Sequence, residues 1–313
     1  MHAEYVAEAA RSLMHEQYGD EAYTRGLNVY TSINMTEQTA AYKALRKGLL
    51  DFDRRQSWRG PEAYIDLPSD PKQIDVRVAE ALEEHPDSED IRAAVVLQAD
   101  PRKLVVAVQS GEQIDIGPDG LKSVGNALTE KASPKQQIRR GAILRINRDK
   151  QGGWYVQQLP EVEGAFVSMD PRTGLIRAMV GGFDFGRNKF NHVTQAWRQP
   201  GSSFKPFIYS AALEKGFTPA TVVNDAPLFF DAGTTGGQAW EPKNYDGKFE
   251  GPMALRRGLA KSKNMISIRV LRSVGAKYAQ DWITRFGFEA DKHPAYLTMA
   301  LGAGSVTPMQ MAD

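Results

Sequence analysis

The sequence contains no cysteine. This absence excludes a disulfide framework, a thiolate metal site and a thiol nucleophile, and it agrees with an oxidising compartment. A zinc-protease signature is also missing, because His15-Glu16 is followed by Gly19 where the second histidine would have to stand. Any chemistry in this chain therefore has to come from other side chains.

The sequence also has no long hydrophobic run and no excess of one charge. No apolar stretch approaches the roughly 18 residues of a membrane span, and the first residues lack the apolar core of a signal peptide. The 39 basic and 38 acidic side chains leave a net charge of +1, which argues against a dedicated polyanion binder. With 42% hydrophobic residues in a chain of 313, the composition is that of a globular protein with about two domains. Since residues 1–4 lead straight into a helical pattern, we expect a piece of a longer protein.

Residues 1–52 have the pattern of a connector. Ala3–Tyr18 and Thr36–Phe52 are predicted helices, and the alternation over Leu27–Ile33 predicts a strand between them. The first helix can bring four apolar side chains onto one face: Tyr5, Ala9, Leu13 and Met14. We expect this segment to dock on a neighbouring domain rather than to form a site.

Residues 53–160 begin with a polar stretch that contains one short predicted helix and then become rich in strands. Turn sequences such as Asp100-Pro101 and Ser110-Gly111 separate these strands. Five short strands in about 70 residues suggest a small β-barrel of the OB type. The predicted strands are Ala93–Gln98, Leu104–Gln109, Gln113–Ile116, Ile143–Asn147 and Trp154–Leu159.

OB barrels often bind oligonucleotides or sugars, and this segment carries several basic residues. Its strands lack a clear set of aromatic side chains for base stacking, so a solvated basic face is favoured over nucleic-acid binding. The basic residues concerned are Lys131, Lys135, Arg139, Arg140, Arg145 and Arg148.

Residues 161–313 begin with a predicted hairpin and continue as loops and helices. The hairpin joins Ala165–Met169 to Leu175–Val180 through a turn that contains Pro171 and Gly174. The pattern predicts an α/β arrangement around an unfinished sheet. Predicted helices follow at Met253–Leu259, Met265–Val274 and Tyr278–Phe286.

One stretch of this region is suited to nucleophilic catalysis. Pro200-Gly201 indicates a turn, Ser202 takes the place of a helix N-cap, and a helix is predicted to follow. Lys205 then lies three residues after Ser202, so that its amine could take the hydroxyl proton if burial lowers the lysine pKa. The helix N-terminus would add N–H groups near the attacked carbonyl. The alternative is a plain capping serine and a solvated lysine.

A second hydroxyl and an amide come from Ser262-Lys263-Asn264, which lies between two predicted helices. Ser262 could relay a proton to a leaving amine, and Asn264 could hold Lys205 and bind a substrate amide. Taken alone, this tripeptide is better explained as a cap for the helix that follows. Another Ser-x-Asn, at residues 32–34, lies in the connector.

Together these stretches carry a resemblance to a known family. Arg198–Leu213, Trp240–Met253 and Leu255–Asn264 resemble the transpeptidase domain of class A penicillin-binding proteins, and Ala165–Gly182 resembles the hairpin that opens this domain. Gly302–Met309 resembles a later helical segment of it. Residues 3–159 resemble the linker and the OB-like insert of the 1A type, most closely at residues 22–30. The resemblance implies an α+β multidomain chain with a linker, a small OB-like barrel and a partial, serine β-lactamase-like transpeptidase domain.

The resemblance also implies a reaction. Ser202 would attack the D-Ala-D-Ala carbonyl of a peptidoglycan stem peptide, with Lys205 as general base and Ser262 and Asn264 completing the proton network. The acyl group would pass to an amine of a neighbouring stem peptide, and β-lactams would trap Ser202 as a stable ester. No metal or cofactor is implied. Residues that would line the cleft, although packing explains their aromatic character equally well, are Trp240, Tyr245 and Phe249.

The family further implies parts outside this sequence. A peptidoglycan glycosyltransferase domain and a membrane anchor would place the parent protein at the periplasmic face of the bacterial inner membrane, and a cell-wall regulatory protein could bind the OB-like domain. The third family motif, Lys-Thr-Gly or Lys-Ser-Gly, does not occur in the sequence. We therefore expect the truncated transpeptidase domain to be impaired. Two alternatives are a non-catalytic binding module and a serine sensor or hydrolase that β-lactams acylate.

Overall fold

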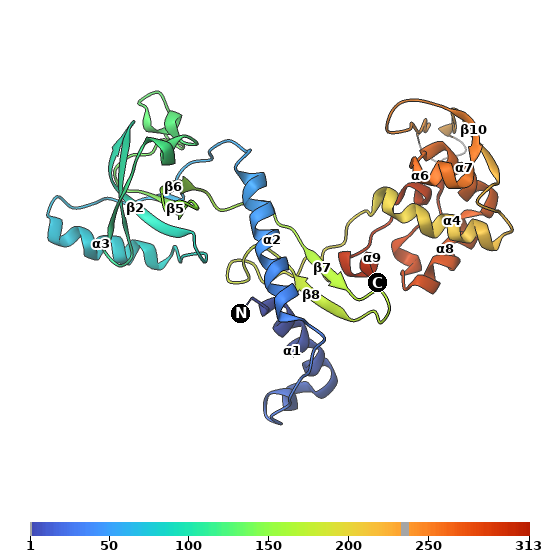
Figure 1. Cartoon of the computed structure of the whole chain (residues 1–313), viewed down its shortest axis with the longest axis horizontal. Coiled ribbons are helices and arrows are strands. Elements are labelled where there is room, and N and C mark those ends of the chain that lie inside the picture. The colour runs from blue at the N-terminus through green and yellow to red at the C-terminus, as the bar shows by residue number, and fades with distance from the viewer. Residues whose placement is uncertain (1, 233–237) are drawn as a thin grey trace. The chain divides into compact units, whose positions relative to one another are not determined.

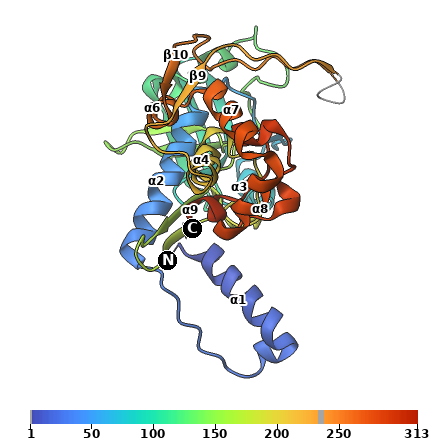
Figure 2. The same cartoon turned by 90° about the vertical axis from the view of Figure 1, so that its right-hand side faces the viewer.

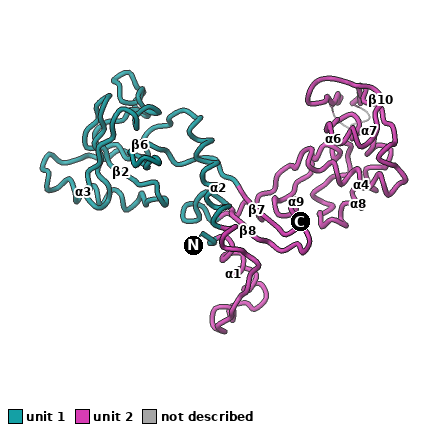
Figure 3. The backbone as a smooth tube through the Cα atoms, in the orientation of Figure 1, with its two compact units in different colours: residues 1–4, 39–164, 182–189 teal, residues 5–38, 165–181, 190–313 magenta. Residues whose placement is uncertain are grey.

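The computed structural model describes residues 2–232 and 238–313, and it divides into two compact units (Figure 3). The first unit consists mainly of residues 39–164, together with a short N-terminal piece and residues 182–189. The second unit contains residues 5–38, 165–181 and the described residues from 190 onward. No helix in the described part of the chain combines the length and the apolar character that crossing a membrane requires.

A six-stranded antiparallel sheet forms the centre of the first unit (Figure 1). The strand order is β1-β5-β2-β3-β4. Strand β5 pairs with β1 through its first residues and with β6 through its last residues. The OB-like architecture predicted from the sequence is confirmed. The additional strand, β1, was not predicted because two residues are too short to show alternation. The strands are β1 (Ala63–Tyr64), β2 (Arg92–Asp100), β3 (Lys103–Val108), β4 (Gln113–Ile116), β5 (Ala142–Arg148) and β6 (Trp154–Gln157).

Both faces of this sheet are buried, because successive side chains of a strand point to opposite sides. Helix α3 (Pro71–Glu83), which begins at the N-cap Asp70, covers one face and packs Val78 and Leu82 in the same cluster as Val95. Val96, the next residue of β2, belongs to the cluster on the other face, which short 3-10 turns between β4 and β5 complete. The sheet is therefore the core of a small domain.

Arg145 corrects the expectation of a solvated basic face. Its side chain is only 5% exposed, and its guanidinium forms two 2.7 Å bonds to the carboxylate of Glu62 and one 2.7 Å bond to the carbonyl of Pro86. Burial raises the pKa of Glu62, but Arg145 and His85 outweigh it, so this pKa lies below its usual value. The alternation of β5 turns Arg145 inward, and charge balance then requires Glu62 beside it.

The described part of the N-terminal segment contains two α-helices, a short 3-10 helix and no strand. Helices α1 (Glu4–Tyr18) and α2 (Met35–Asp53) confirm the two predicted helices, whereas residues 27–33 form an extended segment without ladder partners (Figure 2). This segment is attached near its end, where Ser32 Oγ donates to the Ile176 carbonyl at 2.7 Å. Only one of the four side chains predicted to share a face of α1, Tyr5, is buried, and Leu13 is exposed.

The second unit combines two two-stranded antiparallel sheets with a group of helices. One sheet is the hairpin of β7 (Phe166–Met169) and β8 (Ile176–Val180), and the other pairs β9 (Val222–Asp225) with β10 (Gly251–Ala254), which follows much later in the chain. The helix predicted at Met253 begins two residues later because Met253 and Ala254 are paired in β10. The helices are α4 (Lys205–Glu214), α6 (Leu255–Ala260), α7 (Asn264–Val274), α8 (Ala276–Ile283) and α9 (Pro308–Ala312).

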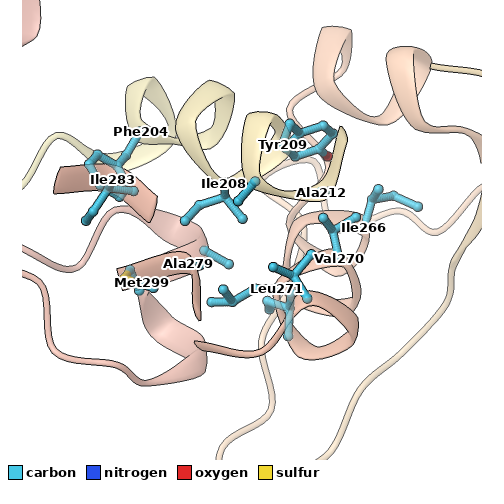
Figure 4. Packing of buried hydrophobic residues seen from close by; sticks show 14 of the residues in the cluster. Phe204, Ile208, Tyr209, Ala212, Ile266, Val270, Leu271, Ala279, Ile283 and Met299 are labelled. Carbon is cyan, nitrogen blue, oxygen red and sulfur yellow. The ribbon is translucent and has the colours of Figure 1, made fainter. Parts of the chain in front are cut away.

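The core of this unit lies between α4, α7 and α8 (Figure 4). From α4, Ile208 and Ala212 are fully buried against Leu271 of α7 and Ala279 of α8. Leu213 belongs to the same helix but is 46% exposed. The packing fixes how α4 is rotated and therefore which of its side chains face α7.

Ile208→Ala should destabilise the second unit by about 2–5 kcal/mol, because it opens a cavity in a closely packed core. Leu213→Ala, on the exposed face of α4, should change the free energy of unfolding by less than about 0.5 kcal/mol. Thermal and denaturant unfolding of both variants would check this difference. Equal losses would contradict the assignment of the core.

Candidate active site

The sequence predicted Ser202 at the N-cap of a helix. In the structure Ser202 lies instead in a tight turn in front of α4. It belongs to a 3-10 helix, η4 (Gly201–Phe204), and the N-cap position of α4 is Phe204. The difference arises because the chain enters the turn through Gly201 at φ +58° and the Lys205 N–H is already bonded to the Ser202 carbonyl. The Ser202 side chain is exposed and makes no capping bond.

Lys205 is fully buried, and its amine faces the loop that precedes α7. Nζ donates to the Ser262 carbonyl at 2.7 Å, to Ser262 Oγ at 3.0 Å and to Asn264 Oδ1 at 2.8 Å. Three of the four predicted catalytic residues are therefore brought together by direct hydrogen bonds. Ser202 is next to this group in the chain, but in the described part of the structure no hydrogen bond joins its hydroxyl to Lys205 Nζ.

The protonation of Lys205 is set by its surroundings. Burial lowers the pKa of Lys205 to about 8, and all three bonding partners are uncharged oxygens. A substantial fraction of the amine is therefore neutral near pH 8, whereas an exposed lysine is almost entirely protonated there. A neutral amine can accept a proton from a hydroxyl.

The loop that holds Lys205 has a strained backbone. Ser262 adopts φ +52°, which is rare for any residue other than glycine, and such a conformation costs on the order of 1–3 kcal/mol. The backbone N–H groups of Ser262 and Lys263 donate to the last turn of α6, at Leu259 and Gly258. The sharp reversal places the side chains of Ser262 and Asn264 on Lys205.

The sequence analysis missed the residues behind this loop. Lys263, which lies between the two residues that contact Lys205, is 2% exposed and is paired with Asp225, Asp246 and Glu250 at 3.5, 3.0 and 3.1 Å. Asn244 is also buried and accepts a 2.8 Å bond from the Asn264 N–H. A lysine in a loop gives no signal of burial, and these carboxylates come from distant parts of the chain.

The three predicted cleft aromatics are placed differently from one another. Trp240 stacks on Phe230 with ring centroids 5.3 Å apart and packs against the core. Tyr245 is fully exposed and follows the loop residue Lys243, whose carbonyl accepts from Asn264 Nδ2 at 2.8 Å. Phe249 is also exposed, at 42%. The structure therefore brings the loop of Tyr245 beside Asn264, whereas Trp240 has a packing role.

A glycine from a later part of the chain, Gly302, packs against the turn that carries Ser202. Gly302 adopts φ +71°, and its carbonyl accepts from the Gly201 N–H at 3.3 Å. A Cβ at Gly302 would lie 2.1 Å from the Gly201 carbonyl oxygen, well inside van der Waals contact. Arg198 and Val306 exchange two backbone hydrogen bonds of 2.9 Å nearby. Residues 302–306 therefore buttress the turn.

The described residues contain no cluster of three or more His, Asp or Glu side chains placed to hold a metal ion.

Comparisons with known proteins identify two domains. Residues 58–162 match the model of the penicillin-binding protein OB-like domain, and residues 164–313 match that of the penicillin binding protein transpeptidase domain.

Relatives match over nearly all of this chain. Penicillin-binding protein 1A of Neisseria lactamica is 45% identical over 99% of the chain, and that of Pseudomonas aeruginosa is 39% identical over 100%. These alignments cover 39% and 38% of the relatives, so the chain spans about two fifths of their length. A crystal structure of penicillin-binding protein 1A from Haemophilus influenzae is similar with a TM-score of 0.86 and 35% identity, over 99% of this chain and 45% of that one.

Gly302→Ala should slow the reaction of the chain with penicillin, for which Ser202 is the predicted nucleophile, by about tenfold or more, because the new methyl group would push the Ser202 turn out of position. Gly174→Ala is a matched control: Gly174 has nearly the same φ, +69°, but nothing lies within 4 Å of its Cβ position. Acylation rates measured with a fluorescent penicillin would separate the two effects. An equal slowing in Gly174→Ala would mean that backbone strain alone causes the effect, and it would contradict the role given to the close contact between Gly302 and Gly201.

Proposed function

The chain belongs to the penicillin-binding proteins, and we propose that it carries the serine acyl-transfer site of a D,D-transpeptidase that cross-links peptidoglycan stem peptides. The observation that supports this most directly is the buried amine of Lys205, held by Ser262 and Asn264 next to the turn of Ser202. These are the residue types and the surroundings that a serine nucleophile with a lysine base requires.

In the proposed mechanism, Ser202 Oγ attacks the penultimate D-Ala carbonyl while the neutral amine of Lys205 takes its proton. Ser262 Oγ, 3.0 Å from Nζ, passes its proton to the departing D-alanine and takes in exchange the proton that Lys205 received from Ser202, which leaves the amine neutral again. The resulting ester is attacked by an amine of a second stem peptide, which forms the cross-link and frees Ser202. Transfer to water instead would give carboxypeptidase activity.

Asn264 has two tasks in this proposal. Its Oδ1 accepts from Lys205 Nζ at 2.8 Å and so fixes the amine, while Nδ2 donates to the Lys243 carbonyl. The substrate backbone would lie along the loop of residues 243–249, where Tyr245 and Phe249 are exposed. Backbone N–H groups at the start of α4 would stabilise charge on the attacked carbonyl.

Several further features are proposed for the parent protein. They are a peptidoglycan glycosyltransferase domain, which the greater length of the relatives allows, and a location at the periplasmic face of the inner membrane. The linker of residues 1–52 would dock on the transpeptidase domain, as the bond from Ser32 to Ile176 supports. A cell-wall regulatory protein would bind the OB-like domain, where a cavity of about 1450 Å³ lies beside Trp58 and Arg139.

The absence of a Lys-Thr-Gly or Lys-Ser-Gly sequence affects the expected rate. In the proposed site this motif would supply an oxyanion N–H and a contact to the substrate carboxylate, and loss of one such donor typically costs about 10²–10³ in rate. We therefore propose that this chain reacts slowly with β-lactams unless a segment with the motif is supplied.

Incubation with penicillin should add the mass of one penicillin molecule to the chain, and Ser202→Ala should abolish this adduct. Ser203→Ala is the matched control, because Ser203 is also exposed in the same turn, and it should retain the adduct. Intact-mass spectrometry reads out both variants after long incubation. An adduct that survives in Ser202→Ala would refute the nucleophile, and rapid loss of the wild-type adduct would favour a hydrolase.

A further inference from the structure

Behind the Ser262–Asn264 loop lies a buried polar network that the proposed reaction does not use. Its centre is Asn244, whose side chain is 4% exposed. The carboxamide oxygen accepts from the N–H groups of Asn264 and Met265 at 2.8 and 3.4 Å, and its nitrogen donates to Asp225 Oδ1 and the Lys248 carbonyl at 2.7 and 2.8 Å. All the hydrogen-bonding capacity of this amide is therefore used.

These bonds join Asn244 to the first turn of α7. The first N–H groups of a helix have no partner within the helix, and here Lys263, at the N-cap position, makes no side-chain cap. The carboxamide of Asn244 replaces that cap from 20 residues away in the sequence. It thus holds the backbone of Asn264, the residue whose Oδ1 contacts Lys205.

The position of Asn244 is itself fixed by a group of charged side chains. Asp225 is fully buried. Its Oδ1 accepts from Asn244, and its Oδ2 accepts from the Glu250 N–H at 3.0 Å and lies 3.5 Å from Lys263 Nζ. Lys263 is also paired with Asp246 and Glu250. The Lys205 amine, by contrast, bonds only to uncharged oxygens.

We propose that Asn244 is a positioning residue for the lysine base: by capping α7 it keeps Ser262 and Asn264 seated on the Lys205 amine. The proposal rests on the proposed function, because that function makes Lys205 the base.

Loss of this amide has a definite physical consequence. Two buried N–H groups at the start of α7 would lose their partner, and the strain at Ser262, which has φ +52°, would no longer be opposed. The loop would move away from α4 and admit water to the amine. Because burial is what lowers the pKa of Lys205, hydration would raise this pKa towards its ordinary value of 10.5.

The test measures the titration of Lys205 directly. The whole chain is prepared with lysine labelled with carbon-13 at Cε, the Lys205 resonance is identified by its loss in Lys205→Arg, and its shift is followed by NMR from about pH 6 to 11. Asn244→Ala should raise the midpoint by about one unit or more, and it should slow acylation by about tenfold at neutral pH. Thermal unfolding establishes that each variant is folded.

Two comparisons separate positioning from a general loss of structure. Asn191→Ala removes another buried asparagine of the same unit, which accepts from the Val193 N–H, and it should leave the Lys205 midpoint unchanged. The exchanged pair Asn244→Asp with Asp225→Asn keeps the net charge, the acceptor for α7 and a bond between positions 225 and 244, but it loses the donor to the Lys248 carbonyl. It should therefore bring the midpoint part of the way back to the wild-type value. Should Asn244→Ala fail to fold, Asn244→Ser is expected to give the same rise.

A folded Asn244 variant with the wild-type midpoint, or an equal rise in Asn191→Ala, would overturn the proposal. The titration needs no turnover, so it is independent of the proposed function. A wild-type chain that titrates near 8 without forming a penicillin adduct would reject that function, while the Asn244 comparison would still decide the positioning role.

Discussion

The hydrogen bonds of the Lys205 amine are the interaction on which the second unit depends. They join α4 to a loop that lies 57 to 59 residues later in the chain, and they do so in a place from which water is excluded. Burial of an amine is unfavourable unless its donors are satisfied, so the surrounding structure has to supply three oxygens in the right places. The packing of α4 on α7 and α8 supplies this arrangement and also lowers the lysine pKa.

This constraint explains two unusual backbone features near the amine. Ser262 has a positive φ, in a reversal that directs both its hydroxyl and its carbonyl to Nζ. Gly302 is required for a different reason, since the turn that carries Ser202 approaches it too closely for a side chain. Both features keep the exposed hydroxyl of Ser202 and the buried amine of Lys205 in adjacent turns of the chain.

Much of the fold followed from patterns in the sequence, and the failures have physical causes. Alternation revealed the five longer strands of the OB-like sheet, but it also predicted a strand at residues 27–33, which pair with no strand in the described part of the chain. Turn and helix signals located Ser202, yet could not show that a 3-10 turn takes the place of an N-cap. Local propensity is overridden where pairing partners or tertiary packing decide.

The candidate site shows the same division between local and long-range information. Spacing singled out Lys205, Ser262 and Asn264, and the structure brings these three together. Nothing in the sequence revealed that Lys263 is buried or that Asn244 caps α7, because both depend on groups brought together only by folding. Arg145 was wrongly predicted to be solvated for the same reason, because its partner Glu62 lies 83 residues earlier in the chain.

The central claim is that neutral Lys205 activates Ser202. The pH dependence of acylation at low penicillin concentration tests it most directly, because a lysine whose pKa is lowered to about 8 is protonated and inactive below that pH and neutral above it. The account predicts that the acylation rate of folded chain rises with pH and levels off above a midpoint near 8. A rate that is flat or falls between about pH 6 and 9 would contradict it.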